Sequence, residues 1–305
     1  VDIWYIYNEP IVDVMFKYQN DMCYPNLLDW NLASNAIYHM VVAHAKVVDV
    51  FKKGNYQGKI GTVLNHGHIY ARSQHPADLL AKHRVELMMQ LSYEEPLLLG
   101  KVNEEWLAFV KEYGAHIEVH EEDASFIANN TISVLGLNIY SPERVKCPTY
   151  QRNSEAPITF DSFSELYIMH GRQMNTDRGW EIYPKCLYDT LILMKEKYGN
   201  PEMRITENGM GIQDEYRFRN KEGQIQDDYR IDYLKKHLKW AHKAIQEGVN
   251  LVGYNMWSFI DLWSPSNQFK NCYGFYEYDL KSGETKRKKS ADWFEYVTKV
   301  NGFEE

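Results

Sequence analysis

The chain has 305 residues, of which 44% are hydrophobic, enough to bury one large core or two smaller ones. The net charge is −8 and the sequence contains no basic arm or stripe, which argues against a nucleic-acid partner. A single basic run covers residues 286–289, just before a predicted C-terminal helix, and we interpret it as a solvated turn. No apolar run is long enough to cross a bilayer, so we expect no membrane partner.

Cysteine usage indicates a reducing compartment. The four cysteines, Cys23, Cys147, Cys186 and Cys272, are scattered and have neither CxxC nor paired spacing. This pattern favours reduced thiols in a cytoplasmic protein over a disulfide framework or a zinc site. The chain starts at Val1, already inside a strand pattern, and we therefore expect that sequence upstream of it is missing.

Segments with strand character alternate five times with segments of helical period. Residues 141–178 lack a clear period and are predicted to form a long loop over the site, and residues 273–278 half of a hairpin. We expect the last helix to be capped by Ser290. The predicted strands are 2–7, 59–64, 133–140, 203–207 and 251–259, and the predicted helices are 31–53, 76–91, 104–113, 183–198, 227–247 and 290–300.

This alternation is typical of an α/β fold with a parallel sheet and helices packed outside it. Five parallel strands form either an open sheet or most of a closed barrel. In both cases, right-handed crossovers place the carboxyl ends of all five strands on one face. Polar and aromatic side chains stand at those ends. They are Asn8, Glu9, Asn65, Asn138, Tyr140, Glu207 and Trp257.

Two of these side chains, Glu9 and Glu207, occur in the same context. Each follows a strand pattern and precedes a chain breaker, Pro10 in one case and Asn208-Gly209 in the other. A single glutamate in a loop is most often only a solvated acid. A pair of carboxyl groups with amides and an indole beside them is what cleavage of a sugar acetal requires.

Four stretches carry a resemblance to a known family: YNEP at 7–10, GLNIY at 136–140, ITENG at 205–209 and YNMWS at 254–258. They resemble the motifs of glycoside hydrolase family 1, the group of β-glucosidases and 6-phospho-β-glycosidases. The resemblance covers the whole chain and implies a single (β/α)8 TIM-barrel domain over residues 1–305. It also implies that the chain supplies roughly strands 4 to 8, with the N-terminal βα units missing.

The resemblance implies a role for each catalytic residue in a retaining, double-displacement mechanism. Glu9 would be the acid/base and Glu207 the nucleophile, with carboxyl groups about 5 Å apart. Asn8 would bind the 2-hydroxyl of the sugar, and Tyr140 would donate to Glu207. We expect a raised pKa for Glu9 and a low pKa for Glu207, and no cofactor.

The same resemblance implies a 6-phospho-β-glucoside as substrate, either a phosphorylated disaccharide or an aryl glycoside. Ser264 stands where relatives acting on plain glucosides have a glutamate, which would repel phosphate. Tyr273 matches the phosphate-binding tyrosine, but Asn271 stands where the lysine is expected. Either the loop shifts and Lys270 takes that role, or phosphate affinity comes from elsewhere. The other predicted substrate-binding residues are Asn138, Trp257 and Trp263.

Several alternatives remain open at this point. Ser264 and Lys270 also fit an ordinary loop. The enzyme could act on unphosphorylated glucosides, or the chain could be a non-catalytic or incomplete sugar-binding relative. A homo-oligomer is compatible with the sequence. Residues 66–68 and 116–120 contain paired histidines, but neither has a matching partner set, so no metal site is predicted.

Overall fold

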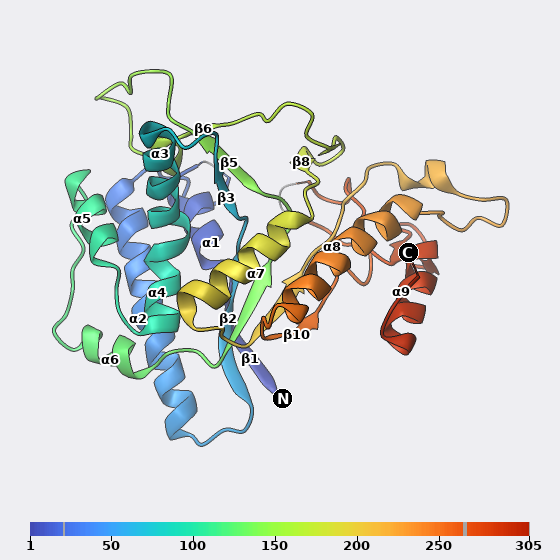
Figure 1. Ribbon diagram of the computed structural model, residues 1–305, viewed down its shortest axis with the longest axis horizontal. Coiled ribbons are helices and arrows are strands. Elements are labelled where there is room, and N and C mark those ends of the chain that lie inside the picture. Colours follow the sequence, from blue (N-terminus) through green and yellow to red (C-terminus); the bar gives the residue numbers. More distant parts are fainter. Residues whose placement is uncertain (21, 265–266, 305) are drawn as a thin grey trace.

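Five parallel strands form the centre of the molecule (Figure 1). The computed structural model describes residues 1–20, 22–264 and 267–304. The strand order follows the sequence, and the predicted parallel sheet is confirmed. The strands are β1 (Ile3–Asn8), β2 (Lys59–Asn65), β4 (Val134–Asn138), β9 (Met203–Glu207) and β10 (Leu251–Tyr254).

The register of the sheet brings the polar strand ends together. Asn65 lies opposite Asn138, and Asn138 lies opposite Glu207. The middle strands β2 and β4 are buried along nearly their whole length, whereas the outer strands β1 and β10 are half-buried. Strands buried on both faces read as continuous apolar runs, which is why the sequence located them.

Helices flank the strands in Figure 1, with α2 and α4 on one side and α7 and α8 on the other. The longest begins at Trp30 because the Asp29 carboxylate accepts a hydrogen bond of 2.8 Å from the Leu32 amide. The main core lies between these helices and the sheet. The helices are α1 (Pro10–Tyr18), α2 (Trp30–Lys53), α3 (Pro76–Glu86), α4 (Ser92–Leu99), α5 (Glu104–Glu112), α6 (Asp123–Asn129), α7 (Lys185–Tyr198), α8 (Asp228–Gln246) and α9 (Lys289–Val300).

Several sequence-based boundaries were wrong. The sequence did not predict α1 or α6, and it ended a helix at Leu91 where a π-helical turn (Leu87–Leu91) leads into α4. The last strand ends at Tyr254, since the following amides bond back to the Glu207 loop, Trp257 N–H to the Asn208 carbonyl at 2.9 Å. Ser290 does not cap α9, because its hydroxyl and amide both bond to Asp227.

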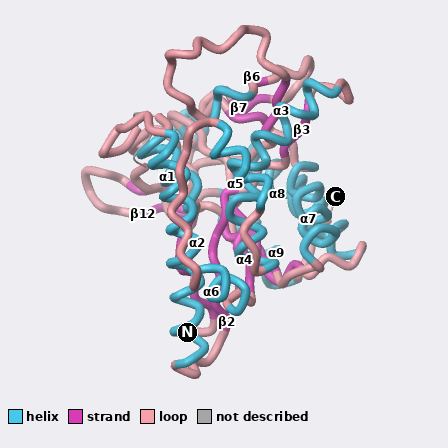
Figure 2. Tube along the Cα trace, turned by 90° about the vertical axis from the view of Figure 1, so that its left-hand side faces the viewer, coloured by secondary structure: helices cyan, strands magenta, loops and turns pink. Residues whose placement is uncertain are grey.

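Short strands and loops gather beyond the carboxyl ends of the sheet (Figures 1 and 2). The segment predicted as a structureless loop, 141–178, contains three of these strands. The predicted hairpin half pairs as expected, β11 with β12. The short strands are β3 (Ile69–Ala71), β5 (Glu143–Lys146), β6 (Glu165–Leu166), β7 (Met174–Asn175), β8 (Trp180–Glu181), β11 (Tyr276–Tyr278) and β12 (Thr285–Arg287).

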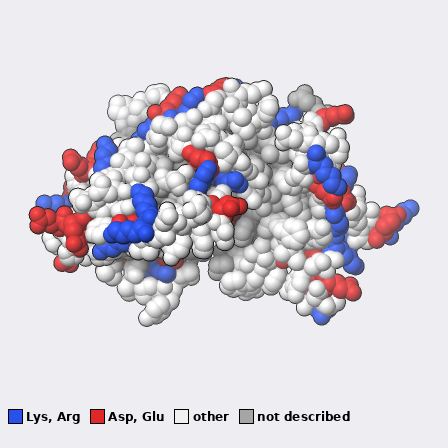
Figure 3. Space-filling model, turned by 90° about the horizontal axis from the view of Figure 1, so that it is seen from below, with Lys and Arg blue, Asp and Glu red and all other residues white. Residues whose placement is uncertain are grey.

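The surface carries both signs of charge. On the face shown in Figure 3, acidic and basic groups lie beside one another around the rim and do not separate into patches. Within the described ranges, none of the helices combines the length and apolar character needed to span a bilayer.

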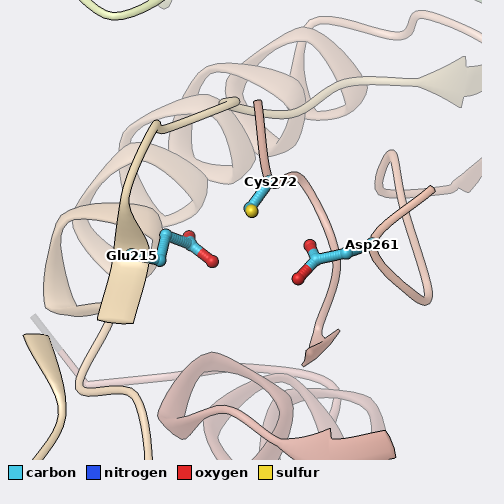
Figure 4. Close-up of side chains that lie close together, drawn as sticks. All are labelled: Glu215, Asp261 and Cys272. Carbon is cyan, nitrogen blue, oxygen red and sulfur yellow. The ribbon is translucent and has the colours of Figure 1, made fainter. Parts of the chain in front are cut away.

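Two buried carboxylates and a partly buried thiol lie close together where the segments that follow β9 and β10 meet (Figure 4). The side-chain ligand atoms of Glu215, Asp261 and Cys272 all lie within 4.8 Å of one another. The ammonium group of Lys288 bonds to both carboxylates, at 2.8 Å from Asp261 Oδ1. Lys288 is fully buried. The interpretation of residues 286–289 as a solvated turn is therefore wrong for Lys288, because its ammonium neutralises these acids.

A second cation completes this network. The buried Arg230 guanidinium bonds to Glu215 at 2.6 Å and to Asp227 at 2.7 Å, and it donates to the Cys272 carbonyl at 2.9 Å. The network thus ties helices α8 and α9 to the two segments that follow β9 and β10. Both segments lead from strand ends that carry predicted site residues, so the network also fixes their position.

Replacing the buried lysine should destabilise the protein strongly. We expect Lys288→Met to lower the free energy of unfolding by about 3–5 kcal/mol, because it leaves the buried Asp261 carboxylate without its paired ammonium group. The measurement is urea denaturation at pH 7. The matched control is Lys286→Met, two residues earlier in the chain, where the side chain is exposed and a change within about 0.5 kcal/mol is expected. Equal effects of the two substitutions would contradict the role assigned to Lys288.

Candidate active site

A cavity of about 590 Å³ opens at the carboxyl ends of the parallel strands. Its volume lies in the usual range for sites that bind small molecules. Seven of the predicted site residues line it together, and they come from β1, β4, β9 and the segments that follow β1, β4 and β10. They are Asn8, Glu9, Asn138, Tyr140, Glu207, Trp257 and Ser264.

Glu9 occupies a sharp turn between β1 and α1. Its backbone is left-handed, with φ of 52°, an uncommon conformation for a residue other than glycine that is enriched at functional sites. Its amide bonds to the Val63 carbonyl at 2.9 Å, and Pro10 starts the helix directly behind it. The Glu9 carboxylate accepts hydrogen bonds from Asn138 at 2.8 Å and Asn65 at 3.3 Å.

Glu207 ends β9 and faces the same cavity. The Tyr140 hydroxyl donates to its carboxylate at 2.6 Å, as the resemblance implied. Burial raises the pKa of Glu207, the Tyr140 hydrogen bond lowers it, and the nearby Glu9 charge raises it. The net direction is upward, so the expectation of a low pKa for Glu207 was wrong, since desolvation outweighs the hydrogen bond.

The residue after Glu207 holds the surrounding strands in place. The buried Asn208 amide donates to the Ile139 carbonyl at 2.6 Å and to the Tyr233 hydroxyl at 3.1 Å, and its oxygen accepts from Tyr254. Its backbone carbonyl accepts from Trp257. Asn208 therefore links the segment after β4, which carries Tyr140, to the segment after β10, which carries the Trp257 indole.

Four predicted substrate-binding residues do not line the cavity. Trp263 is 55% exposed, and Lys270 is exposed as well. Asn271 is buried and donates to the Asp177 carbonyl at 3.2 Å. Tyr273 is buried and its hydroxyl accepts a hydrogen bond of 3.1 Å from Arg178.

The cavity also contains side chains that sequence reasoning missed. Arg178 and Trp180, which belong to the β7–β8 hairpin, are the most informative, and Glu143 and Asp161 add two further carboxylates. The available signal was the run Asn-Thr-Asp-Arg-Gly-Trp at 175–180, which has the composition of a turn with one cation at its tip. The sequence could not place this turn in the structure, because most of it lies in residues 141–178, which have no helical or strand period.

Comparison with known proteins gives a consistent result along the whole chain. The family model described as Glycosyl hydrolase family 1 matches residues 1–303. The 6-phospho-beta-glucosidase GmuD of Bacillus subtilis is 44% identical over 301 residues, which is 98% of this chain and 65% of the relative. Beta-glucosidase A of Acetivibrio thermocellus is 33% identical over 306 residues, covering 99% of this chain and 65% of the relative.

Solved structures agree with the sequence matches. The family 1 β-glucosidase from Thermotoga maritima superposes with a TM-score of 0.86 at 31% identity, over 100% of this chain and 65% of that one. This likeness confirms the predicted fold class, an α/β fold of the TIM-barrel type, in which the described residues form five parallel strands. The chain spans about 65% of the length of the curated relatives named here.

The hydrogen bond from Tyr140 should set the acidity of Glu207. Tyr140→Phe removes a donor that favours the ionised carboxylate, so the pKa of Glu207 should rise further above its ordinary value. A carbon-13 NMR titration of the Glu207 carboxyl group measures this pKa. Tyr150→Phe, at an exposed position, should leave it unchanged. An unchanged or lower pKa in Tyr140→Phe would contradict the assigned interaction.

Proposed function

The chain belongs to glycosyl hydrolase family 1, and we propose that it hydrolyses 6-phospho-β-glucosides with retention of configuration at the anomeric carbon. The observation that carries the proposal is that Glu9 and Glu207 line one cavity, each held by its own hydrogen-bond donors. Two carboxyl groups facing one bond are the working parts of a retaining glycosidase.

In the first step, the Glu207 carboxylate attacks the anomeric carbon while Glu9 protonates the departing glycosidic oxygen. A covalent glycosyl-enzyme forms and the aglycone leaves. The Tyr140 hydroxyl stabilises the ionised Glu207 before attack, since it donates to the carboxylate at 2.6 Å. Asn8, which faces the same cavity, binds the 2-hydroxyl of the sugar.

In the second step, Glu9, now ionised, removes a proton from water, and that water attacks the anomeric carbon and releases Glu207. Because burial raises the pKa of Glu207, activity should fall on the acid side at a pH above that of an ordinary carboxyl group. Below that raised pKa, Glu207 is protonated and cannot attack. We expect the carboxyl groups to lie about 5 Å apart.

Two observations favour a phosphorylated sugar. The relative with 44% identity is named a 6-phospho-beta-glucosidase, and a relative from Streptococcus mutans with 31% identity is named a 6-phospho-beta-galactosidase. In this chain the cavity contains the neutral Ser264, whose hydroxyl can donate to phosphate. Phosphorylated sugars are retained inside cells by their charge, so we infer that the enzyme works in the cytoplasm.

The alternative is a β-glucosidase acting on unphosphorylated glycosides. It is favoured by the relatives from Acetivibrio thermocellus and Thermotoga maritima, both named beta-glucosidase A and both 33% identical. The two proposals share the carboxylate chemistry and differ only in the group at the 6-position of the sugar. A pair of substrates that differ in this group alone therefore separates them.

The wild-type chain should turn over a chromogenic aryl 6-phospho-β-glucoside with a larger kcat/KM than the same glucoside without phosphate. Glu207→Ala should reduce turnover on the order of 10⁴-fold or more, because it removes the nucleophile. Added azide should restore release of the chromophore and yield the α-glycosyl azide. Faster turnover of the unphosphorylated substrate would overturn the phosphate preference.

A glutamate outside the cavity provides the matched control. Glu202 lies just before β9, at the opposite end from Glu207, and forms an ion pair with Lys59. Glu202→Ala should change kcat/KM by no more than about 2-fold. Equal losses in both variants, or undiminished turnover in Glu207→Ala, would remove Glu207 from the role of nucleophile.

A further inference from the structure

The lining of the active-site cavity is strongly acidic. Four carboxylates face it, those of Glu9, Glu143, Asp161 and Glu207. Among the described residues that line it, the one lysine or arginine is Arg178. A phosphate monoester adds a charge of roughly −1.5 to −2 at neutral pH. A sugar phosphate therefore needs a cation in this cavity, and Arg178 is in position to provide it.

The guanidinium of Arg178 is held in a fixed orientation. Its Nε donates to the Tyr273 hydroxyl at 3.1 Å, and its plane lies over the Trp180 ring, 4.0 Å from the ring centre. Across the described parts of the chain, Arg178 forms no ion pair, and its two terminal amino groups have no hydrogen-bond partner. An arginine held in this way keeps two parallel donors free for a phosphate.

The turn that carries Arg178 is itself anchored from two directions. The Gln213 side chain donates to the Asp177 carbonyl at 2.7 Å, and the Asn271 side chain donates to the same carbonyl at 3.2 Å. The Asn175 side chain donates to the Gly211 carbonyl at 2.9 Å. The neighbouring Asp177 carboxylate is engaged by the Gln213 amide and by Arg217, so it does not neutralise Arg178.

The expected alternative cation lies elsewhere. The side chain of Lys270 is exposed and does not line the cavity. Asn271 stands where a lysine was expected, and it supports the arginine-bearing turn instead of reaching the cavity. The cation for a phosphate site therefore comes from the β7–β8 hairpin, and the residues around Arg178 hold it in position.

We propose that Arg178 is the residue that binds the 6-phosphate of the substrate and selects for it. This inference rests on the proposed function, and it names the residue responsible for the preference for phosphorylated sugars. The terminal amino groups of Arg178 contact the phosphate, while its Nε bonds to the Tyr273 hydroxyl and its guanidinium lies against the Trp180 ring. It is a binding residue and takes no part in the proton transfers of Glu9 or in the attack by Glu207.

The test is the binding of glucose 6-phosphate and of glucose, measured by titration calorimetry on the full chain. Wild-type protein should bind the phosphate form more tightly. Arg178→Met, which removes the charge and keeps most of the apolar stem, should weaken binding of glucose 6-phosphate about 100-fold and leave binding of glucose within about 3-fold. Arg178→Lys should retain part of the preference, because a lysine supplies the charge without the paired donors.

Lys270→Met is the matched control and should leave both affinities within about 3-fold. Thermal melting of each variant verifies that it is folded. Raising the salt concentration should weaken wild-type binding of glucose 6-phosphate more than that of Arg178→Met, since an ionic contact is screened.

The outcomes separate the two proposals. A wild-type protein that binds glucose and glucose 6-phosphate equally overturns the proposed function. If the wild-type protein prefers glucose 6-phosphate and Arg178→Met keeps that preference, the inference about Arg178 is overturned while the proposed function stands. If Lys270→Met loses the preference, Lys270 is the residue that binds the phosphate.

Discussion

The amide of Asn138 connects the two halves of the candidate active site. Its nitrogen donates to Glu9 at 2.8 Å and to Asn8 at 3.0 Å, while its oxygen accepts from the Thr206 hydroxyl at 2.7 Å. The side chain is completely buried, so each of its polar atoms needs a partner inside the protein. A carboxylate of the same shape would present only acceptors to Glu9, and an apolar residue would leave Thr206 without a partner. The geometry of the site therefore depends on an amide at this position.

The loops around the site depend on a different interaction, the buried charge network of Arg230 and Lys288. These cations join elements that are remote in sequence, Glu215 after β9 and Asp261 after β10. Buried ion pairs are costly to desolvate, and replacement of a whole pair by apolar groups is often harmless to stability, whereas removal of one partner is not. Here the charges also accept or donate backbone hydrogen bonds, as when Asp261 accepts from the Gly274 amide at 2.8 Å. The network consequently fixes loop position as well as charge balance.

The strands and the polar groups at their ends could be predicted because both are local signals. The run from Ile60 to Leu64 is mostly apolar and is followed by the amide of Asn65, and β4 ends in the same way at Asn138. Lys288 could not be placed inside, since nothing in four consecutive basic residues marks the one whose partners lie far away in sequence. Arg178 was missed for the same reason, because distant residues such as Gln213 anchor its turn.

The pKa of Glu207 shows a second limit of motif reasoning. A nucleophile must be ionised, which suggested a low value, and the Tyr140 hydrogen bond acts in that direction. Burial acts in the opposite direction and is the larger effect. The sequence shows which groups are adjacent to the carboxylate but not how much water they exclude from it. That quantity depends on the whole packed cavity.

The shared anchor of the β7–β8 turn also constrains how this site can change by mutation. Asn271 holds the carbonyl beside Arg178, so the two positions are energetically coupled although their side chains have different tasks. A lysine introduced at 271 would bring a cation but remove the amide that steadies the arginine. Loss of the arginine alone would leave Asn271 supporting a turn with no charge to present. A substitution at either position would therefore change both the charge available at the cavity and the support of the turn that carries it.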